Sequence, residues 1–217
     1  MDNSNTRELL HVTPEWEIPQ VMEALKAALD GTGPALTFGK TDRNEVPSDC
    51  AIVIPTSGST GEPKDVALSS AALKASARAS HDFLGAKKDE RWSLLLPITH
   101  IAGINVLVRA IELGTEPRDM NEVVEYTAIV PTQLHRALHG EEKLLKHLQG
   151  AKAVLVGGAA SSGALLEQAH KAGIKTVTTY GMSEMSGGCV YDNLPLNGVE
   201  IRINDEGAIE LSGPMQA

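Results

Sequence analysis

The segment 56–64 reads TSGSTGEPK and brings hydroxyl side chains, two glycines and a lysine together in one short stretch. Glycines let backbone N–H groups approach a ligand closely, and Ser and Thr hydroxyls donate further hydrogen bonds. The lysine adds a mobile positive charge, so the set suits a polyphosphate. We predict that this phosphate loop binds its ligand through Thr56, Ser57, Gly58, Ser59, Thr60, Gly61 and Lys64.

Two other interpretations of the phosphate loop need to be weighed. A Walker A loop ends in Gly-Lys-Ser/Thr, whereas Lys64 follows Pro63 and precedes Asp65, so the segment does not match that pattern. A Gly/Ser-rich surface turn has a similar composition and is the alternative to phosphate binding. The density of hydroxyls together with the lysine favours phosphate binding.

The residues on either side of the phosphate loop indicate how it is held. Residues 51–55 (AIVIP) are apolar and largely β-branched, which predicts a buried strand that ends at the loop. Ser69 and Ser70 are candidate N-caps for a helix over 71–84. We therefore expect the loop to connect a strand to a helix.

Strand and helix patterns alternate along most of the chain. This alternation predicts an α/β fold with a mostly parallel sheet flanked by helices. The expected elements are strands at 92–96, 127–130, 153–156 and 176–179, helices at 19–29, 101–113, 131–138, 141–148 and 162–172, and a loop over 39–49.

Polar or glycine-rich loops follow four of the expected strands, at 56–61, 97–103, 157–160 and 180–184. Ligands of parallel sheets lie beyond the carboxyl ends of the strands. We therefore expect these four loops to lie along one sheet edge and to surround one site.

The C-terminal residues have a different pattern. Segments 198–203 and 208–211 are separated by Asn204–Gly207, which predicts a β-hairpin. We interpret 1–192 as an α/β core and 193–217 as the start of a β-rich subdomain.

Composition excludes several functional classes. The chain has 217 residues, 42% of them hydrophobic, which is enough for a sizeable core. Its net charge of −9 argues against nucleic acid as a partner. The sequence has no membrane-span pattern and its start, MDNSNTRELL, is not a signal peptide, so we expect a cytoplasmic protein without a membrane partner. We expect Cys50 and Cys189 to be reduced thiols. The sequence leaves open whether the protein forms a homo-oligomer.

Four motifs resemble those of the adenylate-forming enzymes, the acyl-CoA synthetase and luciferase superfamily. They are TSGSTGEPK (56–64), LPITHIAG (96–103), VGGAA (156–160) and TYGMSE (179–184). The resemblance implies that the carboxylate of an acid attacks the α-phosphorus of ATP to give an acyl-adenylate and pyrophosphate. The coenzyme A thiolate then displaces AMP. ATP, Mg²⁺ and coenzyme A are the implied co-substrates and cofactor.

The resemblance also implies roles for individual residues. Lys64 and the rest of the phosphate loop would hold the β- and γ-phosphates, and Glu184 would bind Mg²⁺. The implied catalytic residues are His100, Lys64 and Glu184. The implied nucleotide-binding residues outside the phosphate loop are Gly157, Gly158, Ala159, Tyr180, Gly181, Met182 and Ser183. The candidate acid-binding residues are His100, Arg109, Gly187 and Gly188.

A narrower resemblance is to the o-succinylbenzoate–CoA ligases of menaquinone biosynthesis, through YTAIVPTQL (126–134) and MSGGCVYD (185–192). Their substrate has two carboxylates, and the one that is not activated needs a cation. Arg109 is a candidate by position, with a surface or sheet-facing arginine as the alternative. Two further functions stay open: a ligase for another small aromatic or fatty acid, and a binding module without turnover.

The sequence departs from the family pattern in three respects. Asp65 stands where glycine is usual and Ser183 where threonine is usual. The ribose-binding acid, the hinge and the domain with the catalytic lysine that the family implies do not lie in these residues. We therefore interpret the sequence as the N-terminal part of such an enzyme and expect little turnover from it alone. The remaining histidines are expected at the surface: His11, His81, His135, His139, His147 and His170.

Overall fold

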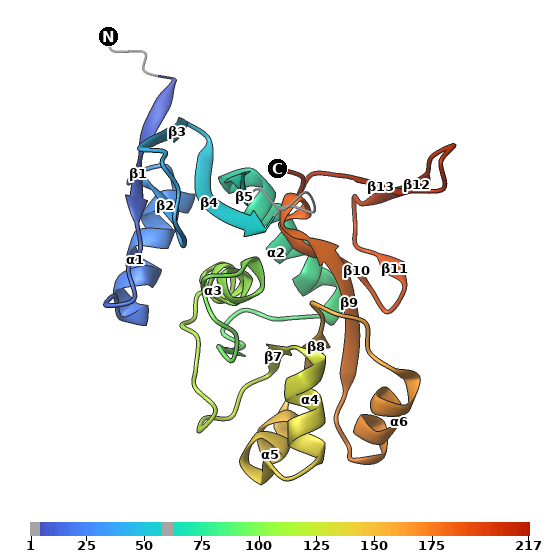
Figure 1. Cartoon of the computed structure of the whole chain (residues 1–217). Coiled ribbons are helices and arrows are strands. Elements are labelled where there is room, and N and C mark those ends of the chain that lie inside the picture. Colours follow the sequence, from blue (N-terminus) through green and yellow to red (C-terminus); the bar gives the residue numbers. More distant parts are fainter. Residues whose placement is uncertain (1–4, 58–62) are drawn as a thin grey trace.

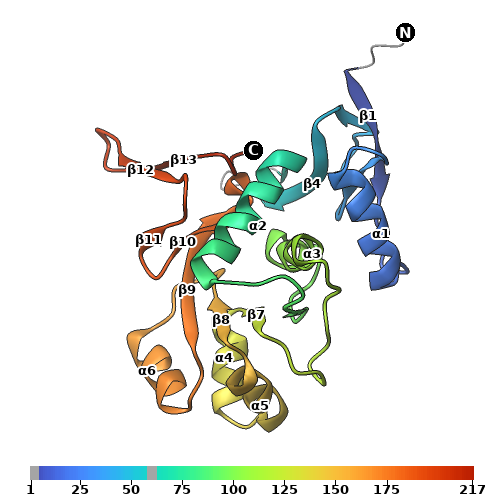
Figure 2. The same ribbon diagram turned by 180° about the vertical axis from the view of Figure 1, so that it is seen from behind.

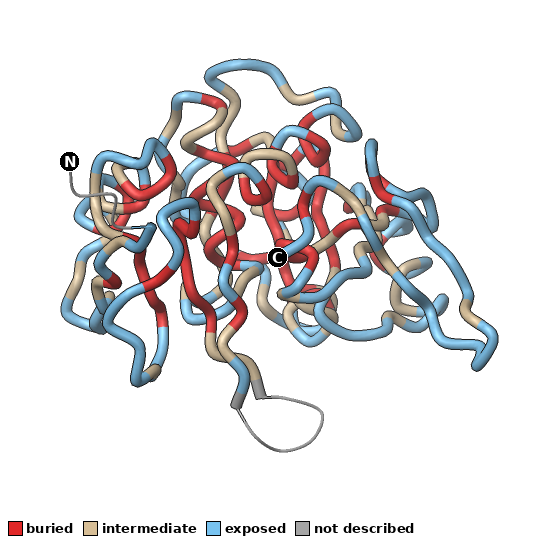
Figure 3. The backbone as a smooth tube through the Cα atoms, turned by 90° about the horizontal axis from the view of Figure 1, so that it is seen from above, coloured by how far each residue is buried: buried red, intermediate tan, exposed pale blue. Residues whose placement is uncertain are grey.

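A computed structural model of the chain describes residues 5–57 and 63–217, arranged as two large sheets with helices between and beside them and a third, two-stranded sheet (Figure 1). Helices α2 (Ser70–Leu84) and α3 (Ile101–Leu113) lie between the two sheets. Figure 2 shows the same layers from behind. Buried residues concentrate in this central region, whereas residues at the periphery are exposed (Figure 3). The α/β class predicted from the sequence is confirmed.

The first sheet has the strand order β3-β1-β2-β4-β5. Strands β1, β2 and β4 run parallel, whereas β3 and β5 are antiparallel to their neighbours. One face packs against α1 (Ile18–Leu29), α2 and α3 in a shared apolar cluster. The strand bounds are β1 Thr6–His11, β2 Ala35–Thr37, β3 Glu45–Pro47, β4 Cys50–Ser57 and β5 Pro63–Ser69.

The second sheet has the order β11-β10-β9-β8-β7-β6, with β6 to β9 parallel and β10 and β11 antiparallel. One face packs against α2 and α3, and the other against α4, α5 and α6. The bounds are β6 Trp92–Ser93, β7 Tyr126–Ile129, β8 Ala153–Val156, β9 Thr176–Met182, β10 Gly187–Tyr191 and β11 Leu194–Pro195, with α4 Pro131–Leu138, α5 Glu142–Gly150 and α6 Gly163–Lys171.

Helix α3 is buried on all sides from Gly103 to Ala110. Its sequence, IAGINVLVRAIEL, is apolar around almost its whole circumference, as expected for a helix in a core. Ile104 packs towards the first sheet and Val106 towards the second. This position places two polar residues of α3, Asn105 and Arg109, in the protein interior.

The predicted setting of the phosphate loop is wrong. The loop joins β4 to β5, an antiparallel pair in which Ser57 faces Pro63, and α2 begins only after β5. Val66 and Leu68 are buried and Ala67 is exposed, so β5 has the two-residue period of a half-buried strand. The N-cap prediction is confirmed, because Ser69 accepts a hydrogen bond from the backbone N–H of Ala72.

Other boundaries also differ from the prediction. The four loops do not follow one sheet, because β4 belongs to the first sheet and β6, β8 and β9 to the second. Strand β6 ends at Ser93, short of the predicted 92–96, because the chain then pairs with Arg118 outside the regular ladder. The expected loop over 39–49 contains β3, and β1 and β2 were not predicted.

The predicted C-terminal hairpin is present as β12 (Glu200–Ile203) and β13 (Ile209–Ser212), which pair antiparallel in a sheet of their own. Among the described residues, no helix is both long enough and apolar enough to cross a bilayer.

Candidate active site

A cavity of about 130 Å³ lies between α3 and the carboxyl ends of β7 and β8, beside β9 and β10. This position agrees with the rule that parallel sheets bind ligands at that edge. Seven of the predicted site residues line it, all of them outside the phosphate loop: Arg109, Gly157, Gly158, Gly181, Met182, Gly187 and Gly188.

Arg109 is the one cation among the residues that line this cavity. The whole residue is only 3% exposed, which excludes the alternative of a surface arginine, whereas the alternative of a sheet-facing arginine agrees with its position against the second sheet. Its Nη2 donates to the hydroxyl of Tyr191 at 2.9 Å, and its Cζ lies 4.9 Å from the ring centroid of Trp92. Its Nε has no hydrogen-bond partner, and among the described residues no carboxylate forms an ion pair with it.

A buried guanidinium without an anion is energetically unfavourable, since burying a charge costs several kcal/mol unless it is paired. The partly satisfied donors of Arg109 are therefore available to an acidic group that enters the cavity.

The walls of the cavity depend on glycines where strands approach closely. A Cβ atom at Gly181 would overlap the carbonyl of Gly187 on the paired strand β10. A Cβ atom at Gly157 would overlap the hydroxyl of Thr179. Packing alone therefore requires glycine at positions 157 and 181.

A second cavity, of about 600 Å³, adjoins the first. The two share Gly158, Thr179 and Gly181 as lining residues. Tyr180 lines the second cavity and is 50% exposed, so a ligand in this cavity can reach its side chain. Ala159 lines it too. The first cavity is therefore largely apolar with a buried cation, and the second lies beside an exposed aromatic side chain.

The phosphate loop is only partly within the described residues. Gly58, Ser59, Thr60 and Gly61 lie outside them, as does the side chain of Ser57. Thr56 donates its hydroxyl to the Lys64 carbonyl at 3.1 Å across the β4–β5 pair, and the Lys64 side chain is exposed.

Asp65 turns away from the loop's lysine into a separate cluster. Its carboxylate accepts hydrogen bonds from the Thr41 hydroxyl at 2.6 Å and from Arg43 Nε at 3.1 Å. The ion pair with Arg43 offsets the acid that replaces the family's usual glycine, and Asp65 adds no uncompensated negative charge beside a phosphate.

The hairpin that carries the phosphate loop meets the second sheet at a short helix. Strand β5 contacts the 3₁₀ helix η1 (Ser183–Met185), which carries Ser183 and Glu184. Glu184 is exposed. The chain after β13 returns to this helix, and the backbone N–H of Ala217 donates to the Glu184 carbonyl at 2.8 Å.

The exposed carboxylate of Glu184 is the kind of ligand that Mg²⁺ usually has in proteins. No group of three His, Cys, Asp or Glu side chains gathers among the described residues. Magnesium sites commonly use one or two carboxylates, with phosphates and water completing the shell. Glu184 meets that requirement alone, provided that a nucleotide supplies the phosphate oxygens.

His100 occupies the N-cap position of α3, with extended backbone angles and an exposed side chain. It does not line the cavity, whereas the next two residues, Ile101 and Ala102, do. Its predicted contact with the acid therefore stays a prediction that depends on a ligand reaching the mouth of the cavity.

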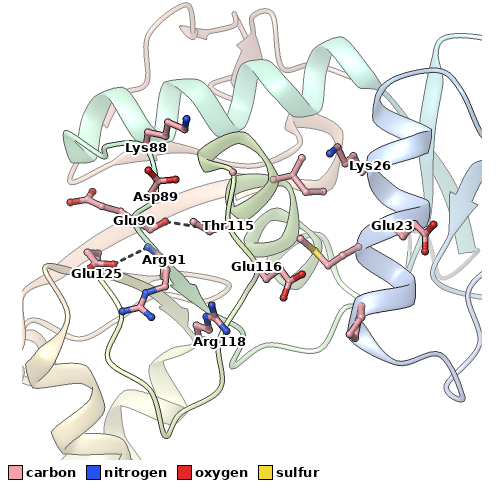
Figure 4. Close-up of a pocket in the computed structure, with 14 residues that line it drawn as sticks. Glu23, Lys26, Lys88, Asp89, Glu90, Arg91, Thr115, Glu116, Arg118 and Glu125 are labelled. Carbon is pink, nitrogen blue, oxygen red and sulfur yellow. Dashed lines mark hydrogen bonds between the residues drawn. The ribbon is translucent and has the colours of Figure 1, made fainter.

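A larger cavity, of about 990 Å³, lies at the other end of α3, beside Gly114 (Figure 4). Acids and bases alternate around it, with Glu23 and Lys26 from α1 on one side and Glu90 and Arg118 on the other. The C-terminal end of a helix carries partial negative charge, which disfavours a phosphate. This cavity is therefore unsuited to the chemistry that the sequence predicts.

Sequence reasoning missed three polar residues of the first cavity. Asn105, 4% exposed, donates to the Ser186 carbonyl at 2.7 Å and so fixes the turn before Gly187. Tyr191 and Thr179 line the cavity from paired strands. A polar pair four residues apart, Asn105 and Arg109, in an otherwise apolar helix was the available signal, because such residues share one helix face.

Two histidines predicted at the surface lie inside. His81 is 8% exposed; burial, together with the positive charge of Arg109, lowers the pKa of its imidazole to about 4. His147 is half-buried, and its Nε2 lies 2.8 Å from the Ser93 hydroxyl. Cys50 and Cys189 are free, as predicted. Both are also buried, and burial raises the pKa of both thiols.

The sequence profile of the family described as "AMP-binding enzyme" matches residues 4–209. The chain therefore belongs to the AMP-binding enzyme family, and the resemblance inferred from its motifs is confirmed at that level.

The curated relatives include 2-succinylbenzoate–CoA ligases; 2-succinylbenzoate and o-succinylbenzoate are the same compound. The probable 2-succinylbenzoate–CoA ligase of Mycobacterium tuberculosis is 38% identical over 94% of this chain and 60% of its own length. The 2-succinylbenzoate–CoA ligase of Escherichia coli K12 is 31% identical over 71% of this chain and 36% of its own length. The chain thus spans about 60% or less of these relatives.

Solved structures share the fold. An AMP-forming acyl-CoA synthetase-like protein from Dyadobacter fermentans is 28% identical, with a TM-score of 0.63 over 75% of this chain and 52% of its own. The o-succinylbenzoate–CoA synthetase MenE of Bacillus subtilis, in complex with ATP and magnesium ion, has a TM-score of 0.67 at 20% identity, over 96% of this chain and 55% of its own. At that identity the likeness concerns the fold alone.

Proposed function

We propose that this chain is the acid- and nucleotide-binding part of an AMP-forming acid–CoA ligase that activates o-succinylbenzoate. The names of its curated relatives support the substrate, and the family supports the acyl-adenylate chemistry. ATP and coenzyme A are then the co-substrates.

Arg109 is the observation that carries the proposal. An aromatic diacid needs an apolar cavity with one cation at the far end, so that the carboxylate that does not react is neutralised. The first cavity has such a cation, which is buried and has no acidic partner in the described part of the chain. A fatty acid would need a continuous apolar tunnel, and a buried guanidinium in its wall would be unfavourable.

The nucleotide would bind across the two adjoining cavities. We assign the adenine to the open face of Tyr180 and the backbone at Gly157 to Ala159, with Gly181 to Ser183 on the other side. The phosphates would then point towards the phosphate loop, and Glu184 would hold Mg²⁺. Charge neutralisation and in-line positioning are the main contributions that such a site makes to attack of the carboxylate on the α-phosphorus, with pyrophosphate as the leaving group.

Several further assignments belong to the same proposal. We place His100 at the mouth of the cavity, beside the carboxylate that reacts, and Gly187 and Gly188 against the aromatic ring. Residues 1–192 would form the α/β core and 193–217 the beginning of a β-rich part. A cytoplasmic location agrees with two free cysteines.

Calorimetric titration of this chain tests the proposal. o-Succinylbenzoate is titrated first, and ATP with Mg²⁺ second, into the wild type, Arg109→Ala and Lys64→Ala. We expect Arg109→Ala to abolish diacid binding and keep ATP binding, and Lys64→Ala to do the reverse. Arg78→Ala, a change of the same type at the protein surface, is the control and should alter neither.

Two outcomes would contradict the assignment. Equal binding of the diacid by the wild type and Arg109→Ala would remove the far carboxylate from this cavity. Binding of ATP but not of the diacid by the wild type would point to a different acid.

A further inference from the structure

The guanidinium of Arg109 is held in place by a buried tyrosine. Tyr191 has no exposed surface, and its hydroxyl accepts the hydrogen bond from Arg109 Nη2 at 2.9 Å. The same hydroxyl lies 3.1 Å from the hydroxyl of Ser80 on α2. A chain of hydrogen bonds therefore runs from α3 through β10 to α2 and fixes the tyrosine oxygen in space.

Two further contacts limit how this group can move. The Trp92 ring supports the guanidinium from one face, with 4.9 Å between Cζ and the ring centroid. The Tyr191 ring is fixed by Phe83, edge to face, at 5.3 Å between centroids. The guanidinium is therefore held at Nη2 and over one face, while its Nε has no hydrogen-bond partner.

We propose that Tyr191 is a positioning residue that orients Arg109 towards the cavity and so makes the site selective for acids with a second carboxylate. This inference rests on the proposed function, because it assumes that an acid occupies the cavity. Tyr191 reaches that position because it lines the cavity from β10 while its hydroxyl points at α3.

The physical reason is preorganisation. An arginine side chain has several rotatable bonds, and ordering it on binding reduces affinity. A guanidinium already fixed by Tyr191 and Trp92 meets the carboxylate without that penalty, and planar two-point contact with a carboxylate depends on its orientation. The gain applies to the second carboxylate and not to the ring or the nucleotide.

The test replaces the hydroxyl and keeps the ring. Tyr191→Phe is titrated with o-succinylbenzoate, with two analogues that each lack one carboxylate, 3-benzoylpropionate and 2-butanoylbenzoate, and with ATP and Mg²⁺. We expect diacid binding to weaken about tenfold or more, as for loss of one hydrogen bond to a charged group. Binding of ATP, and of the analogue that lacks the carboxylate facing Arg109, should stay within about twofold of the wild type, the scatter of near-neutral substitutions.

Tyr126→Phe is the matched control. Tyr126 is 2% exposed and donates its hydroxyl to Glu90 at 2.7 Å, but it does not line the cavity. The Tyr126→Phe substitution should leave the affinities for the diacid, for both analogues and for ATP unchanged. A variant of Ser80, Ser80→Ala, loosens the tyrosine hydroxyl without touching Arg109 and should weaken diacid binding to a smaller degree; it also serves if Tyr191→Phe does not fold.

A second readout needs no ligand. Relaxation of the Arg109 Nε–H group, measured by ¹⁵N NMR, should indicate a rigid guanidinium in the wild type and a mobile one in Tyr191→Phe. An equally rigid group in the variant would overturn the inference.

Two results of the titration would also contradict the proposed role of Tyr191. Unchanged diacid affinity, or equal losses for the diacid and both analogues, would overturn the inference as well, since the tyrosine would then shape the cavity without orienting the cation. Failure of the proposed function looks different: the wild type would not prefer the diacid, whatever the NMR result.

Discussion

Replacing Arg109 by methionine should separate stability from binding, because the two change in opposite directions. Methionine keeps a long flexible side chain and removes the charge. Burial of the guanidinium costs several kcal/mol even after relaxation. The hydrogen bond to Tyr191 returns about 1.5–3 kcal/mol and the contact with Trp92 about 1–2 kcal/mol. Nε has no partner to offset the rest.

We therefore expect Arg109→Met to raise the free energy of unfolding by about 1 kcal/mol and the melting temperature by about 3 °C. Tyr191 keeps Ser80 as a partner, so the substitution leaves its hydroxyl satisfied. Diacid at 100 times its Kd should stabilise the wild type by a further ~2.7 kcal/mol and the variant not at all.

Urea unfolding with and without o-succinylbenzoate measures both effects. Arg78→Met is the control: Arg78 is a surface residue paired with Glu112, and its loss should change stability by less than about 0.5 kcal/mol. A loss of more than about 2 kcal/mol in Arg109→Met would refute the reasoning, since the arginine would then be a structural group and not a cation that awaits an acid.

Three other substitutions test separate parts of the structure. Gly181→Ala places a methyl group against the carbonyl of Gly187 and should cost about 3 kcal/mol in urea unfolding; a cost below about 0.5 kcal/mol would show that the strands separate easily. The imidazole of His81 has a folded-state pKa of about 4, below its ordinary value. Its contribution to the free energy of unfolding is therefore complete above pH 6.5 and declines by about 3 kcal/mol in all as the pH falls towards 4. His81→Gln should flatten that part of the profile of stability against pH, and an unchanged profile would contradict a buried neutral imidazole. Lys64→Arg keeps the charge of the phosphate loop and should retain ATP binding to within about tenfold in calorimetry, whereas a loss as large as that of Lys64→Ala would mean that the ammonium group itself is required.

The nucleotide motifs could be read from the sequence because their determinants are local. A strand end followed by glycines, as at Gly157 and Gly158, gives the same signal in any fold. The alternation of strands and helices likewise predicts the α/β class, because each pattern reflects the period of its own element. Seven predicted residues consequently lie around one cavity.

The pairing of the strands on either side of the phosphate loop could not be predicted from the local sequence. The N-cap candidates Ser69 and Ser70 suggested that the loop leads to a helix. The alternation at Val66 and Leu68 became informative only once a partner strand was known. Which strands pair is decided by contacts between distant segments, and a pattern of seven residues is compatible with several partners.

The sequence by itself determined the family and the class of fold, and it predicted which residues a nucleotide would meet. Only the tertiary structure decided that Arg109 is buried, because burial depends on both sheets enclosing α3 and not on the residue's own type. The same enclosure brings Tyr191 from a distant strand onto the guanidinium. A charge's environment is the sum of all the elements packed around it, so its partners and its energy follow from the fold and not from the local sequence.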